Sequence, residues 1–161
     1  MIAGSIAVNL GTDAFWFAVN LSQNYPLFAG LCVFDCRRLQ LDTHILLWAL
    51  AGSERIDSVN ELILSNDTEV FVSAASWWEL ATKIAIGKLN EDLSELRRVA
   101  QESGFMELPV KGEHTEKLVN LPLLHRDPFD RMLVAQAITE PMKLITADTV
   151  LAKYTDLVML L

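Results

Sequence analysis

The chain has 161 residues, of which 52% are hydrophobic and 21% are charged, and its formal net charge is −8. This length and composition predict one folded domain with a substantial hydrophobic core and exclude an intrinsically disordered chain. The negative charge argues against a protein that binds nucleic acid by general electrostatic attraction. It still allows a nuclease whose clustered carboxylates are neutralised by metal.

Residues 1–38 differ from the rest, because Asp13 is the only charged side chain among residues 1–34 and no helical or strand period persists there. Polar residues interrupt the apolar runs, so none approaches the roughly 20 residues needed to span a bilayer. A secretory signal would need a basic region, and none precedes Arg37. We expect an N-terminal extension that the fold does not need, included through the choice of start site. The alternative is an amphipathic arm that contacts a partner or a membrane.

The two cysteines, Cys32 and Cys36, lie in one short segment. They are too few for a disulfide framework or for a complete zinc site. Together with the absence of a predicted membrane span, this leads us to expect a reducing, cytoplasmic setting.

From Arg38 onward, apolar strands alternate with helical patterns, and we assign residues 39–161 to one domain. Strands are predicted at 39–41, 69–72, 105–108, 143–146 and 158–161. Helices are predicted at 45–51, 58–65, from Ser73 or Ser76 to Gly87, 93–103, 113–120 and from Pro128 onward, with a short helix after Asp148. This alternation indicates an α/β fold built on a parallel sheet.

The stretch LPLLHRDPFDRMLVAQA, residues 121–137, contains the least expected carboxylate. Pro128 suits the first helical position and Asp127 then falls on the N-cap, which is a sufficient role for it and leaves it an accessory metal ligand at best. Asp130 shares a helical face with Val134 and Ile138, so its carboxylate points with the apolar stripe. A carboxylate aimed at a core is costly unless it is paired or binds a cation.

Three further acids are expected near the same edge of the sheet. Asp42 and Asp148 each follow a predicted strand, and Glu79 lies early in the helix after the 69–72 strand. Ligands of open parallel sheets bind at the carboxyl ends of the strands. Four converging carboxylates, without cysteine or paired histidine, favour a hard cation such as Mg²⁺, with Mn²⁺ as the alternative, over zinc.

Each acid also has a purely structural interpretation. Asp42 and Asp148 fit helix N-caps, Ser76 with Glu79 fits a capping box, and Asp130 fits a helix-dipole contact. These roles explain each residue singly. They do not explain why four acids gather at one edge of one sheet.

Histidines and tryptophans give weaker indications. His44 and His125 each neighbour an acid and are candidates for contact with a substrate phosphate, although a lone histidine is more often a surface residue. His114 lies in a polar stretch and gives no such indication. Trp77 and Trp78 are adjacent in a predicted helix and cannot share a face, so one is expected to meet a partner or a groove.

Four segments together carry a family resemblance: LDTHILLWAL, VFVSAASWWELATKIAIGKL, LPLLHRDPFDRMLVAQA and LITADTVLAKY. In this order they closely resemble the PIN-domain ribonucleases, specifically the VapC-type toxins of bacterial type II toxin–antitoxin pairs, over residues 39–161. The resemblance implies an α/β/α sandwich around a central parallel sheet and metal-dependent endonuclease activity on RNA. It also implies inhibition by a cognate VapB-like antitoxin whose C-terminal segment occupies the groove, and a homodimer within that complex.

The resemblance also implies roles for individual residues. Asp42, Glu79 and Asp130 match the three best-matched acids of the family, and Asp148 matches a more variable fourth. Two polar neighbours plausibly orient the ligands, namely Thr43 and Thr146. Such toxins usually begin just before the LDTH strand, whereas 38 residues precede it here.

We therefore hypothesise phosphodiester hydrolysis assisted by Mg²⁺. Asp42, Asp130 and Asp148 would hold the metal, and Glu79 would act through water or as the base that orients the attacking water. Candidate phosphate contacts, each of which is otherwise a solvated charge, are Arg126, Arg131, Lys83 and Lys88. The alternatives are a non-catalytic PIN-fold interaction module and a DNA-directed or structure-specific nuclease.

Overall fold

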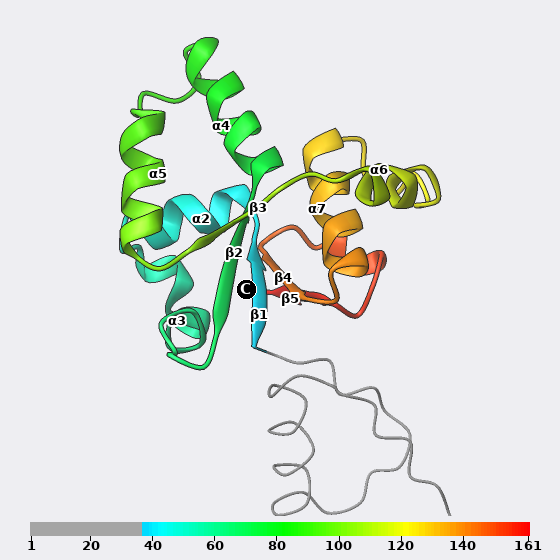
Figure 1. Cartoon of the computed structure of the whole chain (residues 1–161), viewed down its shortest axis with the longest axis horizontal. Coiled ribbons are helices and arrows are strands. Elements are labelled where there is room, and N and C mark those ends of the chain that lie inside the picture. The colour runs from blue at the N-terminus through cyan, green and yellow to red at the C-terminus, as the bar shows by residue number, and fades with distance from the viewer. Residues whose placement is uncertain (1–36) are drawn as a thin grey trace, which may run out of the picture. The chain divides into compact units, whose positions relative to one another are not determined.

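A computed structural model describes residues 37–161, so the predicted N-terminal extension lies almost wholly outside the described residues (Figure 1). Within this part, five strands form one sheet in the order β3-β2-β1-β4-β5, and every pairing is parallel. The strands are β1 (Arg38–Leu41), β2 (Glu69–Ser73), β3 (Met106–Leu108), β4 (Lys143–Thr146) and β5 (Val158–Leu160).

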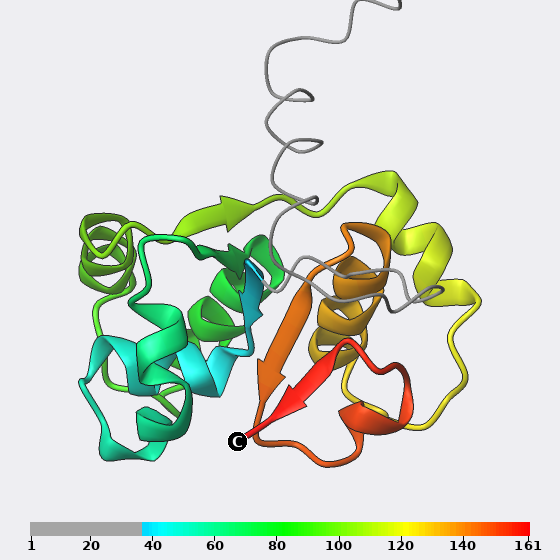
Figure 2. The ribbon, with the colours of Figure 1, turned by 90° about the horizontal axis from the view of Figure 1, so that it is seen from below.

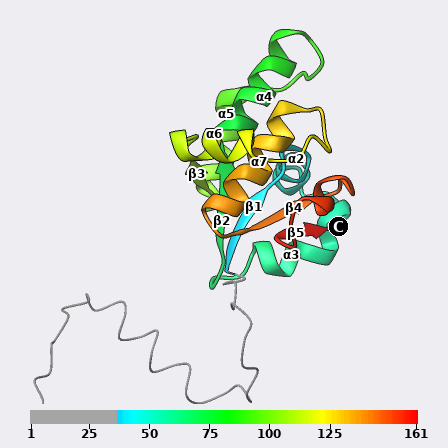
Figure 3. The same cartoon turned by 90° about the vertical axis from the view of Figure 1, so that its right-hand side faces the viewer.

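Helices cover both faces of the sheet, which confirms the predicted α/β/α sandwich (Figures 1 and 2). One face carries α2 (Thr43–Leu50), α3 (Asp57–Ile63), α4 (Ala74–Ala85) and α5 (Leu93–Glu102). The other carries α6 (Gly112–Val119) and α7 (Pro128–Thr139), which lie side by side (Figure 3). Two short 3-10 turns complete the described elements, η1 (Glu54–Ile56) and η2 (Leu151–Lys153). None of the helices in this part of the chain has the length and apolar character needed to cross a bilayer.

Alternation along the strands separates two apolar clusters. Leu39 and Leu41 pack on the side of α2 and α3 with residues such as Ile45. Leu144 belongs to the cluster on the side of α7, together with Leu133. Because successive side chains of a strand point to opposite faces, β4 contributes Leu144 to this cluster and Ile145 to the other.

The α7 side of the sheet also buries one polar network, centred on Gln136. Its Oε1 accepts hydrogen bonds from Gln40 Nε2 at 3.2 Å and from Ser73 Oγ at 2.6 Å. Its Nε2 donates to the carbonyl of Pro109 at 3.3 Å. One side chain of α7 is thereby bonded to β1, to the end of β2 and to the connection between β3 and α6.

The fold brings the carboxyl ends of β1 and β4 next to each other at the centre of the sheet. Asp42 directly follows β1, and Asp148 follows β4 after one intervening residue. Helix α4 starts directly after β2, and α7 starts after the long connection that leaves α6. These four junctions carry the acids singled out in the sequence.

Candidate metal centre

Asp42 occupies the N-cap position of α2, but its side chain makes no capping hydrogen bond, so the interpretation of its carboxylate as a cap is wrong. Asp42 Oδ2 accepts a hydrogen bond from Thr146 Oγ1 at 2.6 Å. Asp42 Oδ1 is buried and has no hydrogen-bond partner within the described residues. Burial raises the pKa of Asp42, although the bond from Thr146 opposes that effect. An orphaned, buried carboxylate oxygen is costly unless a cation satisfies it.

Glu79 lies one turn into α4, and both of its oxygens are engaged. Thr43 Oγ1 donates to Glu79 Oε2 at 2.6 Å, and Lys83 Nζ lies 2.6 Å from Glu79 Oε1. The predicted capping box with Ser76 is wrong, because Ser73 caps α4 and the hydroxyl of Ser76 is buried without a partner among the described residues. Glu79 is therefore held in place by two neighbours.

Asp130 lies in the first turn of α7, which Asp127 caps by accepting from Phe129 N at 2.8 Å. The pKa of Asp130 is raised to about 7, mainly by burial and then by the charges of Asp42 and Asp127. Glu79 adds to this rise, whereas His125 opposes it. Asp42, Glu79 and Asp130 are thus close enough to repel one another. A bound cation would relieve that repulsion.

Asp148 differs from the other acids, because one of its two carboxylate oxygens is hydrogen-bonded within a local turn. Asp148 Oδ1 accepts from Val150 N at 2.7 Å and closes a local turn, but the N-cap of η2 is Val150, so the predicted role of Asp148 as a helix N-cap is wrong. The backbone N–H of Asp148 donates to Thr146 Oγ1 at 3.0 Å, so the hydroxyl that binds Asp42 also fixes this turn. The second oxygen, Oδ2, faces His125 Nε2 at 3.2 Å. Asp148 therefore has one oxygen directed toward the acidic group.

The four predicted phosphate contacts have different surroundings. The guanidinium of Arg131 donates to the backbone carbonyl of Leu118 in α6 at 3.2 Å and to that of Leu121 after α6 at 3.3 Å, which gives it a structural role. Lys83 is paired with Glu79 inside the candidate site. Arg126 and Lys88 are exposed, Arg126 beside the site in the loop before α7 and Lys88 in the turn after α4.

The donor set fits a hard divalent cation. The available ligands are carboxylate oxygens, and the orphaned oxygen of Asp42 is a position that a cation would satisfy. Repulsion between the carboxylates of Asp42 and Asp130 would also be relieved by a cation at this position. Of the predicted acids, Asp130 and Asp148 form, with His125, a group whose ligand atoms lie within 4.8 Å of one another and could hold a divalent metal ion.

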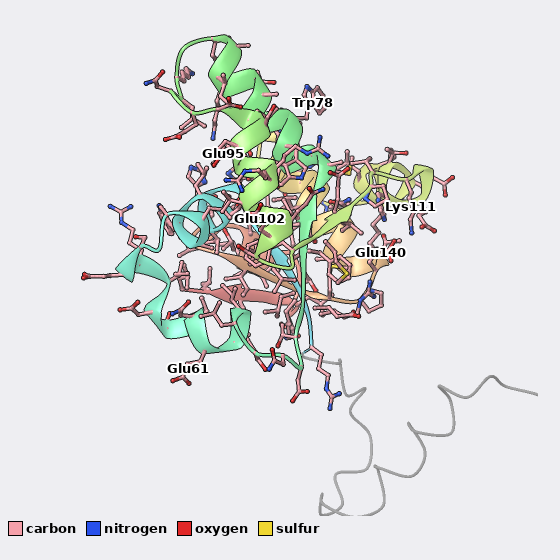
Figure 4. The ribbon with its side chains drawn as sticks, turned by 60° about the vertical axis from the view of Figure 1, so that its left-hand side comes forward. Glu61, Trp78, Glu95, Glu102, Lys111 and Glu140 are labelled. Carbon is pink, nitrogen blue, oxygen red and sulfur yellow. The ribbon has the colours of Figure 1, made fainter. Side chains whose placement is uncertain are left out.

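A second group of ionisable side chains surrounds His114, whose burial the sequence did not suggest. His114 Nδ1 accepts from the backbone N–H of Lys111 at 3.0 Å, so Nε2 carries the proton and faces Glu140 Oε1 at 3.3 Å. Lys111 also pairs with Glu140, and Figure 4 shows the two side chains close together. Lys111 and His114 lower the pKa of Glu140. This group ties α6 to the end of α7, and ligand atoms of Glu113, His114 and Glu140 lie within 4.8 Å of one another.

An apolar groove of about 440 Å³ lies between α4, α6 and α7. Its lining includes Trp78, which is 67% exposed, and Phe129. The two rings meet edge to face with centroids 5.0 Å apart. Trp77 instead packs against the core. The expectation that one of the adjacent tryptophans meets a groove is confirmed (Figure 4).

Comparison with known proteins gives a family and a fold. The family model of the PIN domain matches residues 40–157. VapBC2 from Rickettsia felis, solved bound to a DNA fragment from its promoter, contains a chain with TM-score 0.58 and 16% identity, covering 77% of this chain and 97% of that one. A toxin–antitoxin complex from Klebsiella pneumoniae gives TM-score 0.56 and 19% identity, covering 75% and 95%. DNA-bound VapBC from Salmonella typhimurium gives 0.54 and 15%, covering 77% and 96%. No curated protein sequence matches the chain.

Proposed function

The chain belongs to the PIN-domain family, and on that premise we propose that it is a Mg²⁺-dependent endoribonuclease that hydrolyses RNA phosphodiester bonds. The observation that carries the proposal is the buried oxygen Asp42 Oδ1, which has no partner within the described residues and lies in a group of mutually repelling carboxylates. Such an arrangement costs stability unless a cation completes it.

Asp42 and Asp130 would hold the cation directly, and Asp148 Oδ2, which faces His125 Nε2 at 3.2 Å in this structure, would complete the donor set. A bound divalent cation would polarise the scissile phosphate and lower the pKa of a neighbouring water molecule. Thr146 fixes the orientation of Asp42, and its bond at 2.6 Å leaves the other oxygen of that carboxylate available. Mn²⁺ suits the same oxygen donors.

Glu79 orients the attacking water by accepting a hydrogen bond from it. Thr43 and Lys83 fix the Glu79 carboxylate from two sides, so its direction is set before substrate arrives. The water oxygen bonds to phosphorus and gives up a proton to solvent as the bond from phosphorus to the leaving oxygen breaks, and the leaving oxygen takes a proton from solvent in return. Arg126, exposed in the loop before α7, is the cation best placed to meet the RNA backbone.

We further propose that the enzyme acts in the cytoplasm as the toxin of a toxin–antitoxin pair and is neutralised by a VapB-like antitoxin. The support is the fold shared with chains of three toxin–antitoxin complexes, each covered over at least 95% of its length. The exposed groove around Trp78 supports the formation of a complex with other protein chains. We propose that this complex includes a homodimer of the toxin.

Calorimetric Mg²⁺ and Mn²⁺ binding, with RNA cleavage on the same samples, tests the enzymatic proposal. The full chain, freed of co-purified antitoxin, is compared with Asp42→Asn and Asp130→Asn, which remove charge with little change in volume. Both variants should lose binding and cleave at least 100-fold more slowly, since metal catalysis supplies several kcal/mol.

The matched control is Asp92→Asn, at the N-cap of α5 and far from the acids, where asparagine still caps. This control should behave like the wild type. Cleavage of DNA in preference to RNA would replace the proposed substrate. If the wild-type protein binds no metal and cleaves no RNA, the alternative of a non-catalytic PIN-fold interaction module would be favoured instead.

A further inference from the structure

The imidazole of His125 lies between two of the acids. Nδ1 is 3.3 Å from Asp130 Oδ2, and Nε2 is 3.2 Å from Asp148 Oδ2. One ligand atom from each of these three residues lies within 4.8 Å of the others. The ring thus connects an acid of α7 to an acid that follows β4.

The two ring nitrogens point in different directions, and each faces a different carboxylate. Nδ1 accepts from the backbone N–H of Asp127, so Nε2 carries the proton and donates to Asp148 Oδ2, while Nδ1 lies beside Asp130 Oδ2. The ring itself therefore occupies the space between the oxygens that Asp130 and Asp148 would offer to a metal.

The backbone around His125 is fixed from both sides. Leu124 and His125 each donate a backbone N–H to Tyr154 Oη, at 3.1 and 2.8 Å. The backbone N–H of Asp127 donates to His125 Nδ1 at 3.1 Å. These bonds place the ring beside the acids without help from a ligand, and 24% of the His125 side chain remains exposed to solvent.

We propose that His125 is a resident occupant of the metal centre, bridging Asp130 and Asp148 when no cation is bound and leaving both carboxylates when one enters. This inference rests on the proposed cation site. It adds that a cation must displace the imidazole, so His125 weakens metal binding and sets the cation concentration at which the site fills.

Calorimetric titration with Mn²⁺ at one fixed pH tests the displacement. His125→Ala removes the ring, and His125→Phe keeps a ring without its nitrogens. Loss of the Nε2–H bond to Asp148, and of the ring beside the two carboxylates, should tighten Mn²⁺ binding about threefold to tenfold in His125→Ala. His125→Phe should also bind more tightly, to a degree set by how easily its ring moves aside. The control Asp92→Asn, at the N-cap of α5, should keep the wild-type affinity.

Nitrogen NMR of the three histidines during a Mg²⁺ titration of the full chain gives a second measurement. Single substitutions assign the signals. The His125 signals should shift as the site fills, whereas those of His114, buried with both nitrogens engaged, should remain in place.

The outcomes separate this inference from the proposed function. Weaker binding by His125→Ala would make His125 a ligand and overturn the proposal, as would unchanged binding with static His125 signals. Wild-type protein that still binds metal and cleaves RNA would then leave the proposed function intact. Absence of binding by both wild type and His125→Ala would overturn both.

Discussion

Asp42 and Asp127 each directly precede a helix, yet their carboxylates are used differently. Asp127 caps α7, as its position beside Pro128 predicts. Asp42 bonds to Thr146, which is 104 residues away in the sequence, and caps nothing. Local sequence identifies both as N-cap positions, but only the pairing of β1 with β4 brings the competing partner to Asp42. The residue types of the candidate site were therefore predictable, whereas their hydrogen-bond partners were not.

The contacts of His125 were also not predictable from the sequence. Next to Arg126 and before the Asp127 cap, it looks like an ordinary loop residue. Its relevance comes from Tyr154, which holds the loop, and from Asp148, which the sheet brings opposite the ring. Neither of these two contacts produces a periodic pattern in the sequence from which it could be predicted.

At the residue scale, we predict that Asp130→Asn stabilises the metal-free protein at pH 8 more than at pH 4. The folded-state pKa of Asp130 is raised to about 7, so its carboxyl favours folding most below its unfolded pKa, near 4. That contribution is lost as the pH rises toward and through 7. With about 1.36 kcal/mol for each pKa unit, the upper limit of the gain at pH 8 is about 4 kcal/mol.

Urea unfolding of both proteins across this pH range measures the difference in the free energy of unfolding. Saturating Mg²⁺ should shrink or reverse it at pH 8, because the wild type alone keeps a complete cation site. A variant whose advantage stays constant from pH 4 to 8 would contradict the assigned cause.

At the element scale, the helices and strands followed from apolar period and from glycine stops. Gly87, with φ of 72°, adopts the left-handed conformation that lets the chain leave α4 where predicted. The 3-10 turn η1 was missed, because three residues carry no period; its capping by Ser53 Oγ is a purely local bond. Ser73 rather than Ser76 caps α4, since β2 runs directly into the helix.

The start of α7 gives a prediction at this scale. Asp127→Ala should cost about 1 kcal/mol of stability by removing the cap, whereas Asp127→Asn should cost only a fraction of that. Because Asp130 lies in the same turn, the alanine variant should also weaken Mn²⁺ binding. Urea unfolding and calorimetry on the two variants provide the comparison. Equal loss of stability by both would show that the charge of Asp127, rather than its hydrogen bond, supports the helix.

At the scale of the whole molecule, alternation of strands and helices predicted a parallel sheet but not its strand order. The order β3-β2-β1-β4-β5 depends on pairing between segments about a hundred residues apart, such as Leu41 with Ile145. It places β1 and β4 at the point where the order reverses, which is where open α/β sheets form a crevice. The site lies at that crevice because of topology, which no single motif encodes.

The shared amide of Gln136 has a consequence for which ion the centre accepts. Its bonds to Gln40, Ser73 and the Pro109 carbonyl fix α7 relative to β1 and to the start of α4, the elements that carry the acids. Mg²⁺ requires near-ideal octahedral geometry, whereas the larger Ca²⁺ accepts irregular ligand arrangements. Because these hydrogen bonds fix the elements that carry the acids, we expect the site to favour Mg²⁺, the smaller ion, over Ca²⁺.

Gln136→Leu should therefore let Ca²⁺ compete better against Mg²⁺ in calorimetry, with a stability loss of about 2–4 kcal/mol. Thr139→Val, which loses only a bond within α7, should leave the ion preference unchanged and so serves as the control. An unaltered preference in Gln136→Leu would mean that the acids set ion size by themselves. If the preference does change, discrimination between two biological cations depends on a neutral side chain that touches neither ion.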